Sequence, residues 1–231
     1  MKHQVVPIKT ISRIMEAADA LTTRPAGLPG MGLIYGASGL GKTTACAWLR
    51  NEIDAVYLCA SPLWSPSAML AALSVELGGR PMHRAAAMAD YIGRRLADTG
   101  RAVMIDEADY VMQSARLIDT LRYLHDGTAA PIILIGMTGI DQRVRMREQL
   151  AGRMSQWVQV TPADRDDVGL LVDSLAEVAV DRDLVDHLHL KAKGSVRRVV
   201  VGLSQIEQRA RVRGLVRIGL AEWGDGALFL D

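Results

Sequence analysis

The sequence predicts an α/β domain built on a parallel β-sheet, followed by a small unit made of helices. Short apolar runs alternate with segments of helical periodicity as far as Val160, a pattern typical of a parallel sheet covered on both faces. A glycine-rich turn follows the first apolar run. From Pro162 onward the pattern becomes helical. We therefore expect residues 1–163 to form the α/β domain and residues 164–231 to form a helical lid with a C-terminal extension.

The expected elements follow in order along the chain. Apolar runs predict strands at residues 32–35, 55–60, 102–105, 131–136 and 157–160. Helical spacing predicts helices at residues 9–22, from 44 onward, from 65 or 67 to 77, at 84–98, at 114–125 and over about 164–213. Asp164 or Asp166 is the expected cap of the first helix after Pro162. Residues 214–231 contain Leu228-Phe229-Leu230, which can add a strand, but the pattern does not place this segment.

Composition limits the class of protein. The chain has 231 residues, of which 49% are hydrophobic, so a packed core is expected rather than disorder. It lacks an apolar run of ~20 residues and the apolar core of a signal peptide, so we expect a soluble protein of the bacterial cytoplasm that does not bind membranes. Cys46 and Cys59 have no metal-ligand spacing, and we expect two buried free thiols in a reducing compartment.

The most specific motif is a phosphate-binding loop. Residues 36–43 match G-x-x-x-x-G-K-[ST] between a predicted strand and a predicted helix. Glycines let the backbone curl so that successive N–H groups point at a phosphate, and the following lysine reaches the β- and γ-phosphates. The hydroxyl of Thr43 is placed to ligate Mg²⁺. The sequence therefore predicts that ATP with Mg²⁺ is bound by Gly36, Ala37, Ser38, Gly39, Leu40, Gly41, Lys42, Thr43 and Thr44.

A second motif supplies two carboxylates at the end of an apolar strand. Val103-Met104-Ile105 is followed directly by Asp106 and Glu107. Asp106 is expected to hold the magnesium shell, and Glu107 to orient and polarise an attacking water. The letters Asp106-Glu107-Ala108-Asp109 also spell a helicase signature, but such helicases need two tandem motor domains and this chain is too short for both.

Three further polar residues are candidates for the same chemistry. Thr138, at the end of the fourth strand, can touch the γ-phosphate or the water, or can simply cap the next turn. Arg153 precedes the fifth strand and can project into a neighbouring subunit as an arginine finger, with Arg147 as the competing candidate. Arg197, in the helical segment, can reach back to the γ-phosphate, or can be a surface charge.

This order of motifs resembles the AAA+ ATPases, which form rings or helices. The resemblance places the family's phosphate loop on 36–43, its hydrolysis motif on 103–107 and its first sensor on Thr138. It also places the finger on Arg153 and the lid sensor on Arg197. Within the family, Tyr35-Gly36-Ala37-Ser38-Gly39-Leu40-Gly41-Lys42-Thr43-Thr44 looks most like the DNA transposition regulators. That likeness implies ATP-dependent helical assembly on double-stranded DNA, target-site choice and stimulation of a transposase.

Basic residues gather locally although the net charge is only +1. Phosphate contacts need positive charge without sequence readout, and aromatics make up only 4% of the chain, which disfavours a base-stacking platform. Double-stranded DNA without strong sequence preference is therefore the expected partner, together with a transposase and further copies of the chain. Residues 191–217 form a further basic segment. This segment and the two clusters named next can each instead be a solvated face. The candidate DNA contacts are Arg80, His83 and Arg84 in one loop, and Arg143 and Arg145 after the fourth strand.

Two other functions fit the same motifs. One is a helicase loader or another replication-linked AAA+ ATPase, and the other is a signalling ATPase switch that does not touch DNA. DNA-stimulated hydrolysis distinguishes the DNA-binding functions from the switch.

Overall fold

The computed structural model describes residues 1–2, 4–25 and 27–229, which form two compact units. We call the first the sheet unit, made of residues 14–36 and 42–159. The second is the helical unit, made of residues 1–13, residues 37–41 and the chain from residue 160 onward.

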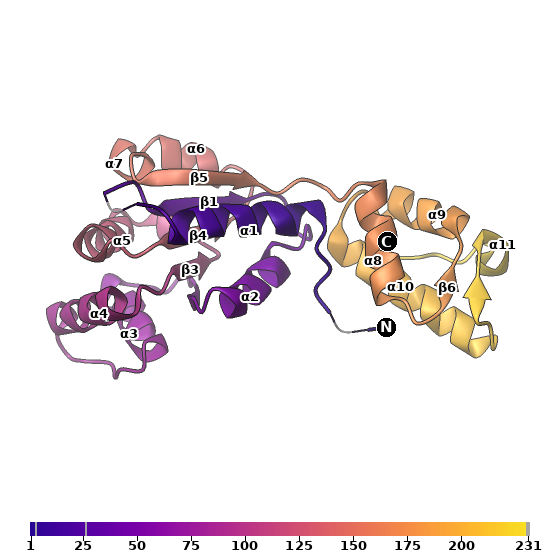
Figure 1. Cartoon of the computed structure of the whole chain (residues 1–231), viewed down its shortest axis with the longest axis horizontal. Coiled ribbons are helices and arrows are strands. Elements are labelled where there is room, and N and C mark those ends of the chain that lie inside the picture. The colour runs from indigo at the N-terminus through magenta and orange to yellow at the C-terminus, as the bar shows by residue number, and fades with distance from the viewer. Residues whose placement is uncertain (3, 26, 230–231) are drawn as a thin grey trace. The chain divides into compact units, whose positions relative to one another are not determined.

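The sheet unit is built on a five-stranded parallel sheet in the order β2-β3-β4-β1-β5. Strands β3, β4, β1 and β5 are labelled in Figure 1. Its strands are β1 (Met31–Tyr35), β2 (Val56–Cys59), β3 (Val103–Asp106), β4 (Ile132–Gly136) and β5 (Met154–Gln159). Strands β1, β3 and β4 are buried almost completely, as expected for central strands covered on both faces. The predicted parallel α/β fold is confirmed.

Helix α1 (Lys9–Thr22) packs closely against β1. Its apolar stripe at Ile14, Ala18 and Leu21 is buried. Gly32 makes this approach possible, because a Cβ atom there would lie 2.7 Å from the Leu21 Cδ1 atom. A side chain at residue 32 would therefore push the helix away from the sheet.

The other helices of the sheet unit follow the strands in alternation. They are α2 (Lys42–Glu52), α3 (Pro66–Glu76), α4 (Ala85–Thr99), α5 (Ala115–Thr128), α6 (Ile140–Arg145) and α7 (Glu148–Ala151), with a short 3-10 helix at Val111–Gln113. Helix α3 packs against α4, and α4 against α5. Of the two predicted caps for α3, Ser65 is the one used, since its hydroxyl accepts a hydrogen bond from the Ala68 N–H at 3.2 Å.

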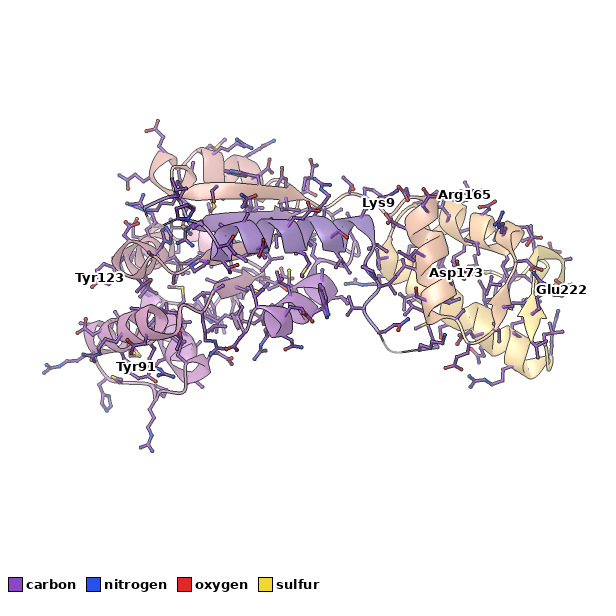
Figure 2. The ribbon with its side chains drawn as sticks, in the orientation of Figure 1. Lys9, Tyr91, Tyr123, Arg165, Asp173 and Glu222 are labelled. Carbon is purple, nitrogen blue, oxygen red and sulfur yellow. The ribbon has the colours of Figure 1, made fainter. Side chains whose placement is uncertain are left out.

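The helical unit contains α8 (Arg165–Leu175), β6 (Ala179–Val180), α9 (Arg182–Ala192), α10 (Val196–Val212), β7 (Arg217–Ile218) and α11 (Leu220–Trp223). Asp164 caps α8 in a reciprocal capping box with Asp167. Asp167 also accepts a hydrogen bond from the Lys9 N–H at 3.0 Å, and the Lys9 ammonium pairs with Asp164. Figure 2 shows the side chains of the helical unit, with Arg165 and Asp173 projecting from α8.

Three expectations need correction. Strand β5 begins at Met154 rather than 157, because the polar residues Ser155 and Gln156 in its first half interrupt the apolar run. In the C-terminal segment, the strand forms at Arg217–Ile218, while Leu228 and Phe229 lie outside any strand and Leu230 lies outside the described residues. Cys59 is exposed, because it is the last residue of the edge strand β2, whereas Cys46 is buried as expected.

Candidate nucleotide-binding site

The phosphate loop lies between β1 and α2, as its motif requires. Gly39 and Gly41 have φ angles of +79° and +89°, in the region that favours glycine. A Cβ atom on Gly39 would lie 2.8 Å from the Ser195 Oγ atom, so the loop has no room for a side chain there. Left-handed glycines before a helix N-terminus form a concave row of N–H groups, and this backbone fits a bound phosphate.

Lys42 is the first residue of α2 and is buried, with only 8% of its surface exposed. Its ammonium donates a hydrogen bond to the Gly36 carbonyl at 2.7 Å and lies 3.7 Å from the Met137 sulfur. Burial lowers the pKa of Lys42 below its ordinary value, while the charge of Asp106 opposes that shift. The hydrogen bond to Gly36 therefore places the Lys42 ammonium against the loop backbone, where a phosphate would be bound.

The carboxylate of Asp106 ends β3 and is also buried. Its Oδ1 atom accepts the Glu107 N–H at 2.8 Å, and its Oδ2 atom accepts the Tyr57 hydroxyl at 2.7 Å. Each oxygen keeps lone-pair capacity for a further ligand, so the group fits the predicted magnesium shell.

Tyr57, on the neighbouring strand β2, is a site residue that sequence reasoning missed. Burial and then the hydrogen bond to Asp106 raise the pKa of Tyr57, so its phenol stays protonated and remains a donor. The only signal in the sequence was a tyrosine in the strand that precedes the acidic motif by one β-α-β crossover. No fixed number of residues separates such a tyrosine from the acidic motif, so the motif does not predict it.

Glu107 has a left-handed backbone with a φ angle of +53°. This conformation costs a non-glycine residue on the order of 1–3 kcal/mol and persists only when its surroundings enforce it. The next residues supply that constraint: the Ala108 N–H donates to the Ile135 carbonyl at 2.8 Å, and the Tyr110 N–H to the Glu107 carbonyl at 3.0 Å. The turn leaves the Glu107 side chain exposed beside the buried Asp106.

Thr138 lies two residues beyond β4 and is exposed. Because β4 stands between β1 and β3, the carboxyl ends of these three strands meet at one edge of the sheet. The structure thus gathers Lys42, Asp106 and the Thr138 segment at that edge, where open parallel sheets bind ligands.

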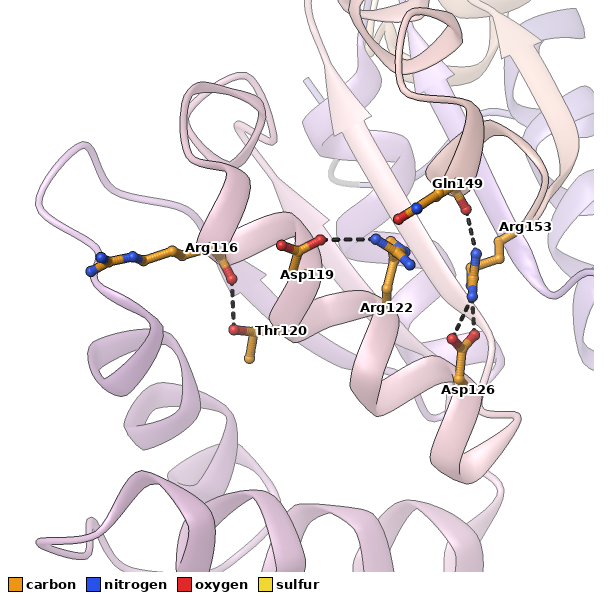
Figure 3. A network of polar contacts seen from close by, with 7 residues as sticks. All are labelled: Arg116, Asp119, Thr120, Arg122, Asp126, Gln149 and Arg153. Carbon is orange, nitrogen blue, oxygen red and sulfur yellow. Dashed lines mark hydrogen bonds and ion pairs between the residues drawn. The ribbon is translucent and has the colours of Figure 1, made fainter.

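Arg153 lies next to the amino-terminal end of β1, opposite the end that leads into the phosphate loop. Its carbonyl accepts the N–H of Met31, the first residue of β1, at 2.9 Å, whereas the phosphate loop follows the last residue of β1. Five residues of strand separate the two by roughly 15 Å. The Arg153 guanidinium forms a bidentate pair with Asp126, with Nε–Oδ1 at 2.6 Å and Nη2–Oδ2 at 2.5 Å (Figure 3).

The pair with Asp126 engages the Nε and Nη2 groups of the Arg153 guanidinium. A third N–H group of Arg153 donates to the Gln149 carbonyl (Figure 3). The hydrogen bond from Arg153 also lowers the pKa of Asp126. Arg147, the competing finger candidate, is exposed, and its side chain forms no hydrogen bond or ion pair with residues 1–2, 4–25 and 27–229.

Arg197 belongs to the first turn of α10 in the helical unit, which also contains residues 37–41. Its backbone N–H donates to the Gly39 carbonyl at 3.0 Å, and its side chain is exposed. The Ser195 hydroxyl caps α10 and donates to the same carbonyl at 3.2 Å. Residues 195–197 therefore contact the phosphate loop through a serine hydroxyl and a backbone amide.

The candidate DNA contacts differ in how far they are engaged. Arg80, His83 and Arg84 lie in the exposed segment between α3 and α4, and in the described part of the chain their side chains have no hydrogen-bond or ion-pair partner. Arg143 instead pairs with Asp109, and the Arg145 guanidinium stacks 4.2 Å from the Trp157 ring.

Most arginines of segment 191–217 are likewise engaged within the helical unit. Arg198 and Arg209 stack on Phe229 and Trp223, and Arg217 pairs with Asp181 at 2.6 Å. This segment is therefore less available to DNA than its composition indicates. No helix in the described residues is long and apolar enough to cross a membrane.

The fold and this site define a phosphate-loop ATPase of the α/β class. A family model described as "AAA domain" matches residues 26–144, which is just over half of the chain. The chain therefore belongs to the AAA domain family.

Three solved structures illustrate the likeness in fold. Cdc6p from Pyrobaculum aerophilum has a TM-score of 0.69 at 15% identity, covering 94% of this chain and 66% of that one. The Aeropyrum pernix Orc1 protein in complex with DNA has a TM-score of 0.62 at 16% identity, covering 90% and 61%. The Thermotoga maritima RuvB Holliday junction branch migration motor has a TM-score of 0.63 at 15% identity, covering 94% and 67%. The chain thus spans about two thirds of their lengths or less. No curated protein matches by sequence.

Proposed function

We propose that this chain is an ATP-dependent, DNA-binding AAA+ ATPase that assembles on double-stranded DNA and regulates transposition, in the manner of protein B of phage Mu. In this role it chooses the target site and stimulates a transposase inside the bacterial host cell. We also propose residues 1–163 as the nucleotide-binding domain and residues 164–231 as the lid and extension.

The gathering of Lys42, Asp106 and Glu107 at one edge of the sheet carries the catalytic part of the proposal. Bound ATP and Mg²⁺ supply the phosphoryl group and its charge neutralisation. Residues 36–44 hold the phosphates, Thr43 and Asp106 hold the cation, and Glu107 positions and polarises a water. Thr138 and Arg197 are the residues that we propose as sensors of the γ-phosphate.

The exposed segment between α3 and α4 carries the DNA-binding part. Arg80, His83 and Arg84 are exposed and lack a side-chain partner in the described residues, so they can meet phosphates without first breaking an internal pair. Arg145 is exposed as well, and Arg143 becomes available only if its pair with Asp109 opens. The likeness to the Orc1 protein solved with DNA and to RuvB supports a DNA-associated role.

A trans-acting arginine completes the proposed site. Arg153 lies at the edge of the sheet away from its own phosphate loop, so it can serve only a neighbour's nucleotide. Because Arg153 is paired with Asp126, its role as the finger should be compared by experiment with that of the exposed Arg147. Lys42→Ala subunits, which lack a working loop, are mixed with Arg153→Ala or with Arg147→Ala subunits. Recovery of activity with Arg153→Ala supports Arg153, and recovery with Arg147→Ala alone identifies Arg147.

A replication-linked role, such as helicase loading, is the second candidate. The fold that the chain shares with Cdc6p and Orc1, at 15–16% identity, is the observation that favours it. A signalling switch without DNA is a third candidate.

The deciding experiment measures ATP hydrolysis and sedimentation with and without double-stranded DNA. We expect hydrolysis to be stimulated by DNA, and Glu107→Gln to bind ATP, hydrolyse it ~10²–10⁴-fold more slowly and persist on DNA as oligomers. Equal DNA binding with and without nucleotide overturns the assembly model. Hydrolysis indifferent to DNA favours the switch. Transposase stimulation by the chain separates transposition from replication.

The DNA contacts have a matched test. Replacing Arg80, His83 and Arg84 with Ala should weaken DNA binding and reduce the salt dependence of log Kd by roughly 0.9 for each lost phosphate contact. Arg116→Ala, an exposed arginine on α5 (Figure 3), should leave both unchanged. If the triple variant binds DNA as wild type does, the contacts lie elsewhere.

A further inference from the structure

Asp109 joins the acidic motif to the segment that follows β4. Its Oδ2 atom accepts the Met137 N–H at 2.7 Å, and its Oδ1 atom pairs with the Arg143 guanidinium of α6. The Asp109 side chain is only 17% exposed. Both oxygens of Asp109 are therefore engaged in holding other groups of the chain.

Gly136 leaves the space that this contact needs. A Cβ atom there would lie 2.8 Å from the Asp109 Oδ2 atom and 2.5 Å from the Ile140 Cδ1 atom. Any side chain at residue 136 would displace the carboxylate or the start of α6. The close fit indicates that the Asp109 contact is built into the turn after β4.

The segment held by Asp109 is Met137–Thr138, which lies beside the phosphate-loop lysine and contains the candidate sensor. The sulfur of Met137 lies 3.7 Å from the Lys42 ammonium, and Thr138, the candidate sensor, follows directly. The backbone of Met137 is thus fixed on one side by Asp109 while its side chain reaches the phosphate-loop lysine. A shift of the Met137 amide would move Thr138 with it.

We propose that Asp109 is a positioning residue, which holds the Met137–Thr138 segment in place for ATP hydrolysis, with Arg143 as its countercharge. This inference rests on the proposed ATPase function. It assigns Arg143 to the support of the site, because the ion pair holds the Oδ1 atom of Asp109 and so fixes the direction of Oδ2, the oxygen that accepts the Met137 N–H.

Hydrogen–deuterium exchange tests the contact without requiring activity. In the full chain, Asp109→Ala should raise exchange in the peptide that contains the Met137 amide, because that N–H loses its acceptor. Asp119→Ala is the matched control, since Asp119 is an exposed aspartate paired with Arg122 at 2.8 Å on α5 (Figure 3). Unchanged exchange at Met137 in Asp109→Ala overturns the proposal, whether or not the wild type hydrolyses ATP.

Steady-state kinetics then test the positioning role. A small misplacement of a group at the reacting centre can cost ~10²-fold in rate, so Asp109→Asn should lower kcat by about 10- to 100-fold. The affinity for a fluorescent ATP analogue should stay within about twofold, because the phosphate loop is intact. Arg143→Lys, which keeps the charge but loses the fork, should fall between Asp109→Asn and wild type.

The outcomes separate the two proposals. A wild-type chain that does not hydrolyse ATP refutes the proposed function, while the exchange result still decides the Asp109 contact. Raised exchange with unchanged kcat in Asp109→Asn shows a contact without a positioning role and overturns this inference. If circular dichroism shows that Asp109→Asn is unfolded, Arg143→Lys supplies the same kinetic comparison.

Discussion

The pair between Arg153 and Asp126 allows a quantitative test of the surface electrostatics. The perturbation is Asp126→Asn, which keeps the shape of the side chain and removes its charge. Exposed ion pairs contribute about 0.2–1 kcal/mol, and bidentate geometry favours the upper part of that range. The Arg153 side chain is 27% exposed and the Asp126 side chain 46%, so water screens the pair. We therefore expect a coupling energy of about 0.5–1 kcal/mol.

A double-mutant cycle measures this coupling. Urea unfolding is followed for wild type, Asp126→Asn, Arg153→Gln and the double variant, and the interaction energy is the departure from additivity. One molar salt should remove most of it, because the Debye length falls from about 10 Å to about 3 Å. A coupling above about 2 kcal/mol, or one that salt does not change, would refute the description of this pair as a solvent-screened contact.

The pH dependence of the same pair has a definite sign. Arg153 lowers the pKa of Asp126 in the folded chain below its ordinary value. The stabilisation is therefore fully present above the ordinary carboxyl pKa of about 3.9 and is lost as the pH falls through the folded value. In Arg153→Gln the loss on acidification should be smaller. An equal acid response in both chains would contradict the assignment.

Three other predictions follow from the site and the caps. Lys42→Ala should abolish nucleotide binding, since the loop loses its lysine, and ATP affinity within about twofold of wild type would rule out the phosphate-loop assignment. Tyr57→Phe should raise the Mg²⁺ concentration needed for half-maximal nucleotide binding without changing binding in EDTA, because only the orientation of Asp106 is affected; identical magnesium titrations would exclude a role for the phenol. Asp164→Ala should lower the free energy of unfolding by about 1 kcal/mol through loss of the α8 cap, and Asp173→Ala, on the same helix, is the comparison for differential scanning calorimetry.

The sequence predicted the parts of the fold that local patterns encode. The strands before Gly36 and Asp106 are short apolar runs, and their burial in the centre of the sheet follows from that composition. The capping residue Asp164 was one of two predicted candidates, and it is used because Asp167 completes the reciprocal box. In these places the nearest neighbours in sequence decide the structure.

The contacts that were missed join residues distant in sequence. The Tyr57 phenol reaches a carboxylate 49 residues away, and Arg153 pairs with an aspartate 27 residues away. Strand β5 was predicted too short because it is an edge strand, so its polar first half needs no apolar pattern. Side-chain pairing of this kind depends on strand order and register, which periodicity does not specify.

The left-handed backbone of Glu107 has a consequence for how this chain would change under selection. Glycine adopts that conformation without strain, so Glu107→Gly should relieve on the order of 1 kcal/mol at this turn. A library selected only for thermal tolerance or expression would therefore be expected to enrich glycine at residue 107. A library selected for turnover should retain the glutamate. The ratio of the two residues in parallel selections would report how far this turn trades folding stability against chemistry.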